Sequence, residues 1–276
     1  AINGLNMASD ENIVKVMDYG DFNGNPYLVM EYLPGGTLKQ YLKEHGRLSW
    51  QQSAKIILAI AESLSYAHSQ NIIHRDIKPS NILLGTDLRP ILSDFGVAKV
   101  IDEETTQDLT GTSATVGTPE YMAPEQVTSK VIDHRADMYS LGVVFFEMLT
   151  GRKPFVADTP LAVLFKHLSD PLPKPRDFAG DIPESVEMVV FTVLAKDPRD
   201  RYQDMEQFSS ALKRLLDADV KQHTSESQKI VVEKSDKEFE KETIQKGTTK
   251  KGLLTSDQVS ARRSTKKRNW IKWSAA

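Results

Sequence analysis

The order of apolar and polar positions predicts short strands in the first third of the chain. Apolar residues alternate with polar ones over residues 13–19, and a second β-like run covers residues 27–33. The segment DFNGNP separates them, and its Asn23-Gly24 pair favours a tight turn with positive φ, so a β-hairpin is expected. Two shorter apolar runs at 82–84 and 91–93 flank GTDLRP and predict a second hairpin.

Helical periodicity dominates after the first hairpin. Ser49 followed by Gln52 has the capping-box pattern, and apolar residues then recur at helical spacing to about Ser69. Residues 137–150 are apolar nearly all round, which is typical of a central helix, and Gly151 is expected to end it. Further amphipathic helices are predicted over residues 160–168, 184–195 and 204–217. Strands followed mostly by helices predict an α+β fold.

Composition narrows the class of protein. The 276 residues are 39% hydrophobic and 26% charged, which is ordinary for a folded domain and excludes wholesale disorder. The absence of cysteine excludes a disulfide framework and any zinc site built on thiolates. No apolar stretch approaches the ~20 residues that a membrane-spanning helix needs.

The charge changes sign along the chain. Residues 1–216 carry 21 Lys and Arg against 29 Asp and Glu, whereas residues 217–276 carry 14 against 9. Residues 217–262 are rich in Lys, Glu, Ser, Thr and Gln and contain only scattered apolar side chains. This composition is typical of a disordered linker, so we expect one folded domain over 1–216 and a charged, flexible segment over 217–276.

Three segments carry the candidate chemistry. They are His74-Arg75-Asp76-Ile77-Lys78-Pro79-Ser80-Asn81, then Asp94-Phe95-Gly96, and then Gly117-Thr118-Pro119-Glu120-Tyr121-Met122-Ala123-Pro124-Glu125. A carboxylate such as Asp76 can orient an acceptor hydroxyl and take its proton. Asn81 and Asp94 offer the hard oxygen ligands that Mg²⁺ prefers, and Lys78 can reach a transferred phosphate.

In this order and spacing, the three segments resemble the catalytic loop, the metal-binding motif and the end of the activation segment of eukaryotic-like protein kinases. The resemblance covers residues 1–216 and implies the protein-kinase-like fold, mainly its helical C-lobe with a remnant of the β-rich N-lobe. It implies ATP and Mg as cofactors, Asp76 as catalytic base with Lys78 beside it, and Asn81 and Asp94 as metal ligands. It also implies that backbone groups of Glu31 and Leu33 contact adenine above Leu83 and that Lys78 and Asp94 belong to the nucleotide site.

The same resemblance implies a regulatory switch. In these kinases the position of Arg75 pairs with a phosphorylated residue of the activation segment. Thr110, Thr112 and Thr115 stand where such phosphosites occur, in a polar stretch between Gly96 and Gly117. A phosphate there would bring about two negative charges and could order the segment through Arg75. The alternative is a polar loop that carries no phosphate.

Four more residues are expected to have architectural roles. Glu125 is expected to form an ion pair with Arg201 that anchors the end of the activation segment. Asp137, at the start of the central helix, resembles the residue that braces the catalytic loop through backbone N–H groups. His74 is expected to pack behind that loop.

The acceptor class also follows from the resemblance. Lys78-Pro79 and Gly117-Thr118-Pro119-Glu120 are similar to serine/threonine kinases, so the expected partners are proteins phosphorylated on Ser or Thr. The segments PEYMAPEQ and DMYSLGVVFFEMLTGRKPF resemble the bacterial membrane-anchored subgroup. A small-molecule kinase of the antibiotic phosphotransferase type fits less well, because those proteins generally lack the Ala-Pro-Glu segment.

Parts of the family pattern have no counterpart in the sequence. The Gly-rich loop, the strand Lys and the helix Glu would all fall at or before Ala1, so an N-terminally truncated kinase domain is expected. The alternative is a non-catalytic kinase-like scaffold without the ATP lid. The upstream reading frame would discriminate between the two.

Residues 261–276 form a basic, aromatic end. Six Lys and Arg residues precede or accompany Trp270 and Trp273, the pattern of the cytoplasmic edge of a membrane span. We therefore expect a cytoplasmic kinase domain, an anionic membrane surface as partner of this segment, and an anchor to the cell membrane beyond residue 276. Nucleic-acid binding is a weaker alternative because the rest of the chain is acidic, and a plain solvated tail is a third.

Overall fold

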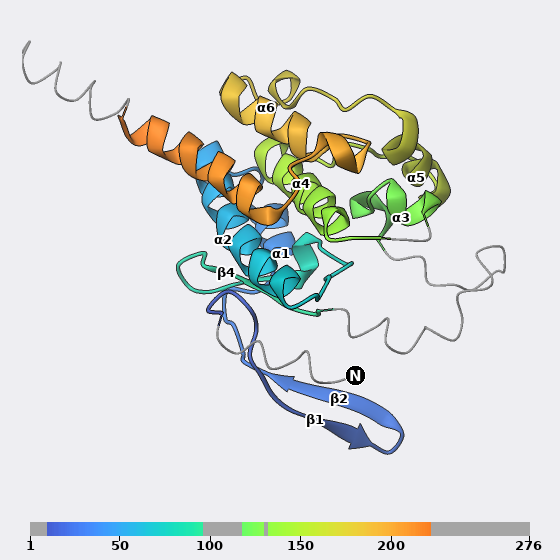
Figure 1. Ribbon diagram of the computed structural model, residues 1–276. Helices are drawn as coiled ribbons and strands as arrows, with labels where there is room; N and C mark the ends of the chain where they lie inside the picture. The colour runs from blue at the N-terminus through green and yellow to red at the C-terminus, as the bar shows by residue number, and fades with distance from the viewer. Residues whose placement is uncertain (1–9, 96–117, 130–131, 222–276) are drawn as a thin grey trace, which may run out of the picture. The chain divides into compact units, whose positions relative to one another are not determined.

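The computed structural model describes residues 10–95, 118–129 and 132–221 (Figure 1). An antiparallel hairpin comes first, two helices and a second hairpin follow, and the rest of the described chain is mainly helical. The chain divides into two units, residues 1–220 and 221–276, and all but the first residue of the second unit lie outside the described ranges. The predicted linker 217–262 therefore falls mostly outside them, and the boundary near residue 217 stays a prediction. The α+β class is confirmed.

None of the helices within the described ranges combines the length and apolar character required to cross a bilayer.

The Asn23-Gly24 turn joins the first predicted pair of strands. Strand β1 (Val16–Phe22) pairs antiparallel with β2 (Asn25–Met30), and both turn residues have positive φ, 56° and 79°. The prediction of a hairpin is confirmed, but β1 begins and ends later than the apolar pattern indicates, whereas β2 begins and ends earlier. Ile13 is buried and bridges instead to Leu92, because residues 12–14 run beside the second hairpin.

The second predicted hairpin is confirmed as β3 (Ile82–Leu84) and β4 (Pro90–Leu92). The two central helices are confirmed as well. Helix α2 (Trp50–Ser69) begins after Ser49, whose side chain accepts a hydrogen bond from the Gln52 N–H. Helix α4 (Arg135–Thr150) ends at Gly151, whose φ of 74° is the left-handed conformation that glycine adopts without strain.

Helix α4 is the centre of the hydrophobic core. Nearly all of its residues from Ala136 to Leu149 are buried, and it packs against both α2 and α6 (Glu184–Val193), as Figure 1 shows. A helix enclosed in this way has no polar face, which explains the apolar sequence. The remaining elements are α3 (Glu125–Thr128), α5 (Pro160–Ser169), a helical segment over 205–221, and the 3₁₀ turns η2 (Pro79–Asn81), η3 (Pro119–Tyr121), η4 (Pro175–Asp177) and η5 (Pro198–Asp200).

Helix α1 (Leu38–His45) is absent from the sequence-based elements. Its start is nevertheless encoded locally: Thr37 and Gln40 form a reciprocal capping box, and Gly46 ends the helix with a φ of 76°. The helix is only two turns long and directly follows Gly35-Gly36, so it offers little periodicity to read. Its buried Leu38 packs into the main core, which supplies the stability that so short a helix lacks alone.

The link between β2 and α1 lies directly against β3. The Leu84 N–H donates to the Gly36 carbonyl at 2.9 Å, and Thr37 bridges to Leu83. A Cβ on Gly35 would stand 2.4 Å from the Leu84 carbonyl oxygen, so only glycine allows this approach. The approach brings the link that contains Leu33 close to β3, the strand that follows residues 74–81.

Candidate active site

The loop between α2 and η2 is held by a buried carboxylate. Asp137, in the first turn of α4 and 1% exposed, accepts the N–H of His74 at 2.8 Å and that of Arg75 at 2.7 Å. His68, from the end of α2, lies 2.9 Å from the same carboxylate through its Nε2. These bonds hold Arg75 at a φ of 67°, a left-handed conformation that costs about 1–3 kcal/mol for a residue other than glycine.

The imidazole of His74 connects this loop to the strand beyond it. The side chain is fully buried; its Nε2 lies 2.9 Å from the Ser93 carbonyl, and its Nδ1 lies 3.3 Å from the Asp76 nitrogen. A carbonyl only accepts, so Nε2 carries the proton and Nδ1 accepts the N–H of Asp76. His74 thereby fixes the backbone at Asp76 relative to residues 93–95, and its ring packs against Phe95.

Two polar side chains, those of Lys78 and Asn81, contact the Asp76 carboxylate. Lys78 Nζ lies 2.7 Å from Asp76 Oδ2 and donates to Thr118 Oγ1 at 3.1 Å. Asn81 Nδ2 donates to the same carboxylate oxygen at 3.0 Å and to the Asp76 carbonyl at 2.9 Å. Asp76 Oδ2 is thus held by a cation and an amide at once, while Oδ1 accepts no hydrogen bond within the described parts of the chain.

Asp94 follows β4 and is tied to the same loop through Ser93. The Ser93 N–H donates to the Asn81 carbonyl at 2.9 Å, and Ser93 Oγ lies 3.2 Å from Asp94 Oδ2. Asp94 is exposed and has a φ of 61°, so its backbone is held in another left-handed conformation. These contacts hold the backbones of Asn81 and Asp94 in neighbouring positions.

The oxygens of Asn81 and Asp94 fit a magnesium ion. Mg²⁺ usually takes one or two protein ligands and completes its shell with water and phosphate oxygens, so a dedicated cage is not needed. The described residues contain no group of three or more His, Cys, Asp or Glu side chains that could form one. The Asn81 amide nitrogen is committed to Asp76, so Oδ1 is its potential ligand atom; this oxygen accepts from Ser80 Oγ at 3.2 Å and has a second lone pair.

The residues expected around adenine lie along the link between β2 and α1. The Glu31 N–H is committed to the Lys15 carbonyl at 3.1 Å, and Glu31 itself is exposed. Leu33 is half-buried, and its backbone makes no hydrogen bond to any of the described residues. Leu83 is half-buried in β3, and the Gly36–Leu84 bond brings the link close to it.

Besides the contact of Thr118 with Lys78, two side-chain contacts hold the segment from Thr118 to Tyr121 in place. Lys153 Nζ lies 2.9 Å from Glu120 Oε1, and the Tyr121 hydroxyl donates to Glu147 Oε2 at 2.6 Å. Burial raises the pKa of Tyr121, as does the Glu147 carboxylate, so the hydroxyl stays protonated and keeps donating. Burial also opposes ionisation of Glu120, but the hydrogen bond from Lys153, a backbone hydrogen bond and the charges of Lys153 and Lys39 together outweigh it and hold the pKa below the usual value.

A bidentate ion pair closes this segment at its far end. Arg201 donates to both carboxylate oxygens of Glu125, at 2.7 and 2.8 Å. Its remaining N–H groups donate to the carbonyls of Ala195, Arg135 and Lys196. The side chains are 0% and 13% exposed, so the pair is largely removed from water.

Sequence reasoning missed three residues of the site. Thr118 lies in a quoted motif, yet its bond to Lys78 spans 40 residues and has no local signal. Ser93 precedes the Asp-Phe-Gly triplet as an ordinary polar residue, and His68 stands in the last turn of α2 without a spacing that marks it. The candidate phosphosites Thr110, Thr112 and Thr115 and the basic end 261–276 lie outside the described residues.

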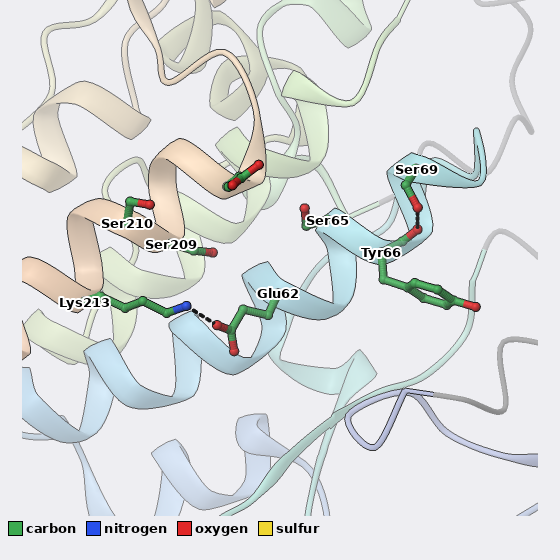
Figure 2. Close-up of a pocket in the computed structure, with 8 residues that line it drawn as sticks. Glu62, Ser65, Tyr66, Ser69, Ser209, Ser210 and Lys213 are labelled. Carbon is green, nitrogen blue, oxygen red and sulfur yellow. Dashed lines mark hydrogen bonds and ion pairs between the residues drawn. The ribbon is translucent and has the colours of Figure 1, made fainter.

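A shallow polar groove of about 490 Å³ lies elsewhere, between α2 and the helical segment 205–221. Figure 2 shows Ser65 and Tyr66 on one side, Ser209 and Ser210 on the other, and the ion pair of Glu62 with Lys213 at 2.7 Å. None of the residues around Asp76 lines it, so we do not assign it to the candidate active site.

The chain belongs to the protein kinase domain family, which matches residues 2–217. It is 36% identical over 208 residues to the serine/threonine-protein kinase PrkC of Bacillus subtilis, covering 75% of this chain and 32% of that protein. It is 39% identical over 208 residues to the serine/threonine-protein kinase PknB of Mycolicibacterium smegmatis, covering 74% and 33%. A probable serine/threonine-protein kinase of Clostridium acetobutylicum is 38% identical over 196 residues, covering 71% and 29%.

The chain thus spans about a third of the length of these curated relatives. The predicted resemblance to bacterial serine/threonine kinases and the predicted kinase-like fold are confirmed.

Proposed function

We propose that the protein transfers the γ-phosphoryl group of Mg·ATP to serine and threonine hydroxyls of protein substrates. The observation that carries the proposal is the cluster at Asp76, in which one carboxylate oxygen is bound by Lys78 and Asn81 and the other is left for an acceptor. Membership of the protein kinase domain family supports the reaction class, and similarity to serine/threonine-protein kinases supports the acceptor class.

Asp76 is the group that receives the acceptor hydroxyl. A hydroxyl that donates to Oδ1 has its oxygen lone pairs directed away from the carboxylate and toward an incoming phosphoryl group. As the oxygen–phosphorus bond forms, the proton passes to Asp76. Because His74 and Asp137 fix the backbone at Asp76, its carboxylate is positioned before substrate binds. Positioning of this kind, together with electrostatic stabilisation, supplies most of the rate acceleration in phosphoryl transfer.

Lys78 is placed to contact both the Asp76 carboxylate and the phosphoryl group that is transferred. Its ammonium group contacts Asp76 and Thr118 at once, so it stands between the carboxylate and the end of the activation segment. There it can neutralise charge on the transferred phosphoryl oxygens as the bond to the leaving group breaks.

Asn81 and Asp94 would hold Mg²⁺, which would neutralise charge on the phosphates. For the nucleotide itself, the free backbone groups of Leu33, the carbonyl of Glu31 and the side chain of Leu83 would contact adenine.

Transfer of labelled phosphate from ATP tests both the activity and its regulation. The full-length protein that carries this sequence should phosphorylate Ser or Thr peptides in the presence of Mg²⁺, with no transfer when EDTA is present.

Mass spectrometry of the same reaction should find phosphate on Thr110 or Thr112, with Thr115 as the third candidate. If Arg75 pairs with that phosphate, phosphatase treatment should lower the rate of transfer. Phosphate on acceptor tyrosine alone, or full activity of a Thr110→Ala/Thr112→Ala variant, would contradict these proposals.

We propose further that residues 261–276 contact an anionic membrane surface. The six Lys and Arg side chains would each contribute roughly 1 kcal/mol near acidic lipid, and Trp270 and Trp273 suit the headgroup region. The protein should co-sediment with vesicles containing phosphatidylserine but not with pure phosphatidylcholine vesicles. A variant with Arg262, Arg263, Lys266 and Lys267 changed to Gln should lose binding, and unchanged sedimentation would refute the contact. An anchor beyond residue 276 stays a prediction.

A further inference from the structure

His167 is a buried histidine that the proposed mechanism does not use. It lies in the last turn of α5 and is 0% exposed, yet neither of its ring nitrogens is without a partner. Nδ1 lies 2.9 Å from the Tyr139 hydroxyl of α4, and Nε2 lies 3.0 Å from the backbone carbonyl of Glu120. The ring therefore connects two helices to the Thr118–Tyr121 segment beside the catalytic loop.

The partners of His167 define its tautomer. The Glu120 carbonyl only accepts, so Nε2 carries the proton, and Nδ1 of the neutral ring accepts the hydrogen of Tyr139. Burial, together with the charge of Lys196, lowers the pKa of His167 to about 4, which keeps the ring neutral near pH 7. Burial has the opposite effect on Tyr139: it raises the pKa of the hydroxyl, which therefore stays protonated and remains a donor.

The surroundings leave the ring little freedom. The ring of Phe155 meets it edge-on with centroids 4.9 Å apart. Lys196 donates to the His167 carbonyl at 2.7 Å and to the Lys166 carbonyl at 3.1 Å, so it closes the end of α5. Side chain and backbone of His167 are thus both fixed, as expected for a residue that holds another segment in place.

We propose that His167 is a positioning residue for the protein acceptor: its Nε2–H fixes the Glu120 carbonyl and with it the segment that presents Thr118 to Lys78. The inference rests on the proposed kinase function. Acceptor peptides would contact the Thr118–Tyr121 segment, whereas nucleotide would contact the β2–α1 link and Asp94. Loss of the Glu120 bond therefore weakens acceptor binding and leaves nucleotide binding unchanged.

Two substitutions separate the bond to Glu120 from the bond to Tyr139. In His167→Gln, the amide nitrogen can occupy the place of Nε2 and donate to the Glu120 carbonyl, so this bond is kept. In His167→Asn, the shorter side chain reaches only the place of Nδ1, so it can contact Tyr139 but not Glu120. In the full-length protein, His167→Asn should raise the KM for an acceptor peptide by about tenfold, since it leaves a buried carbonyl unpaired. The KM for ATP and kcat should stay within about threefold, and His167→Gln should keep the acceptor KM near that of the wild type.

Hydrogen exchange gives a second readout that needs no activity. The Tyr121 and Met122 N–H groups donate to the Thr118 and Pro119 carbonyls, so their exchange reports the integrity of η3. They should exchange faster in His167→Asn than in His167→Gln, and His45→Asn, at an exposed histidine of α1, is the matched control. If His167→Asn does not fold, Tyr139→Phe, like His167→Gln, loses the bond between Tyr139 and His167 and keeps a donor for the Glu120 carbonyl, so both should show wild-type exchange at η3. Faster exchange in both would assign the role to the Tyr139 bond and overturn the inference.

The outcomes are distinct. If the wild type is inactive but the variants show the expected exchange pattern, the kinase function is contradicted, whereas the role of the His167–Glu120 bond in fixing η3 is supported. An active wild type whose acceptor KM is the same in His167→Asn overturns the inference, as does an equal loss in the Asn and Gln variants. A KM increase for ATP as large as that for the acceptor also overturns it.

Discussion

Asp76→Asn is expected to lower kcat for phosphoryl transfer to a serine or threonine peptide by about 10²–10⁴-fold, the usual contribution of a positioned general base. The amide has the shape of the carboxylate, and its oxygen still accepts from Lys78 and Asn81, so the loop keeps its contacts. Its NH₂ group cannot take a proton from the acceptor hydroxyl. Initial rates with labelled ATP at saturating peptide measure the effect directly.

The control for this variant is Asp217→Asn, which changes the same residue type at an exposed position near the end of the helical segment 205–221. Both variants should unfold within about 2 °C of the wild type, because neither removes a buried group. Turnover by Asp76→Asn at the rate of Asp217→Asn would exclude Asp76 as the base. A loss of rate that follows the loss of folded protein would assign it a structural role instead.

The parts of the fold that the sequence predicts are those with a local cause. Ser49 marks the start of α2, Gly151 marks the end of α4, and Asn23-Gly24 marks the first hairpin, each through the conformation or hydrogen bond of that residue itself. Helix α1 carries an equally local capping box at Thr37, but two turns of helix give too few apolar positions for a periodic pattern.

The candidate site likewise contains features that a local motif predicts and features that depend on contacts between distant residues. Asp76, Lys78 and Asn81 belong to one motif, His74–Asn81, which the resemblance identifies as a loop, and the structure brings their side chains together. The left-handed backbone of Arg75 is not predictable from its residue type, since arginine avoids that conformation. Asp137, 62 residues further along the chain, accepts the Arg75 N–H, so the conformation is a tertiary effect.

The ion pair of Arg201 with Glu125 should be the most sensitive point of the described fold. Arg201→Met is expected to lower the free energy of unfolding by about 3–5 kcal/mol, because it leaves the largely buried Glu125 carboxylate without its cation. It also removes the donors to the carbonyls of Ala195, Arg135 and Lys196, which lie behind the Glu125 end of the segment. Equilibrium urea denaturation measures the difference.

Arg199→Met is the matched control two residues away. Arg199 is exposed and pairs with Asp197 at the surface, so its loss should cost less than about 1 kcal/mol. The double variant Arg201→Met/Glu125→Met should be more stable than Arg201→Met alone, because it removes the unpaired buried charge. Equal destabilisation by Arg199→Met and Arg201→Met, or a strictly additive double variant, would show that burial gives this pair no special weight. If the single Arg201 variant is destabilised as expected and also loses acceptor phosphorylation under conditions where it remains folded, the anchoring of the Thr118–Glu125 segment is what the ion pair contributes to activity.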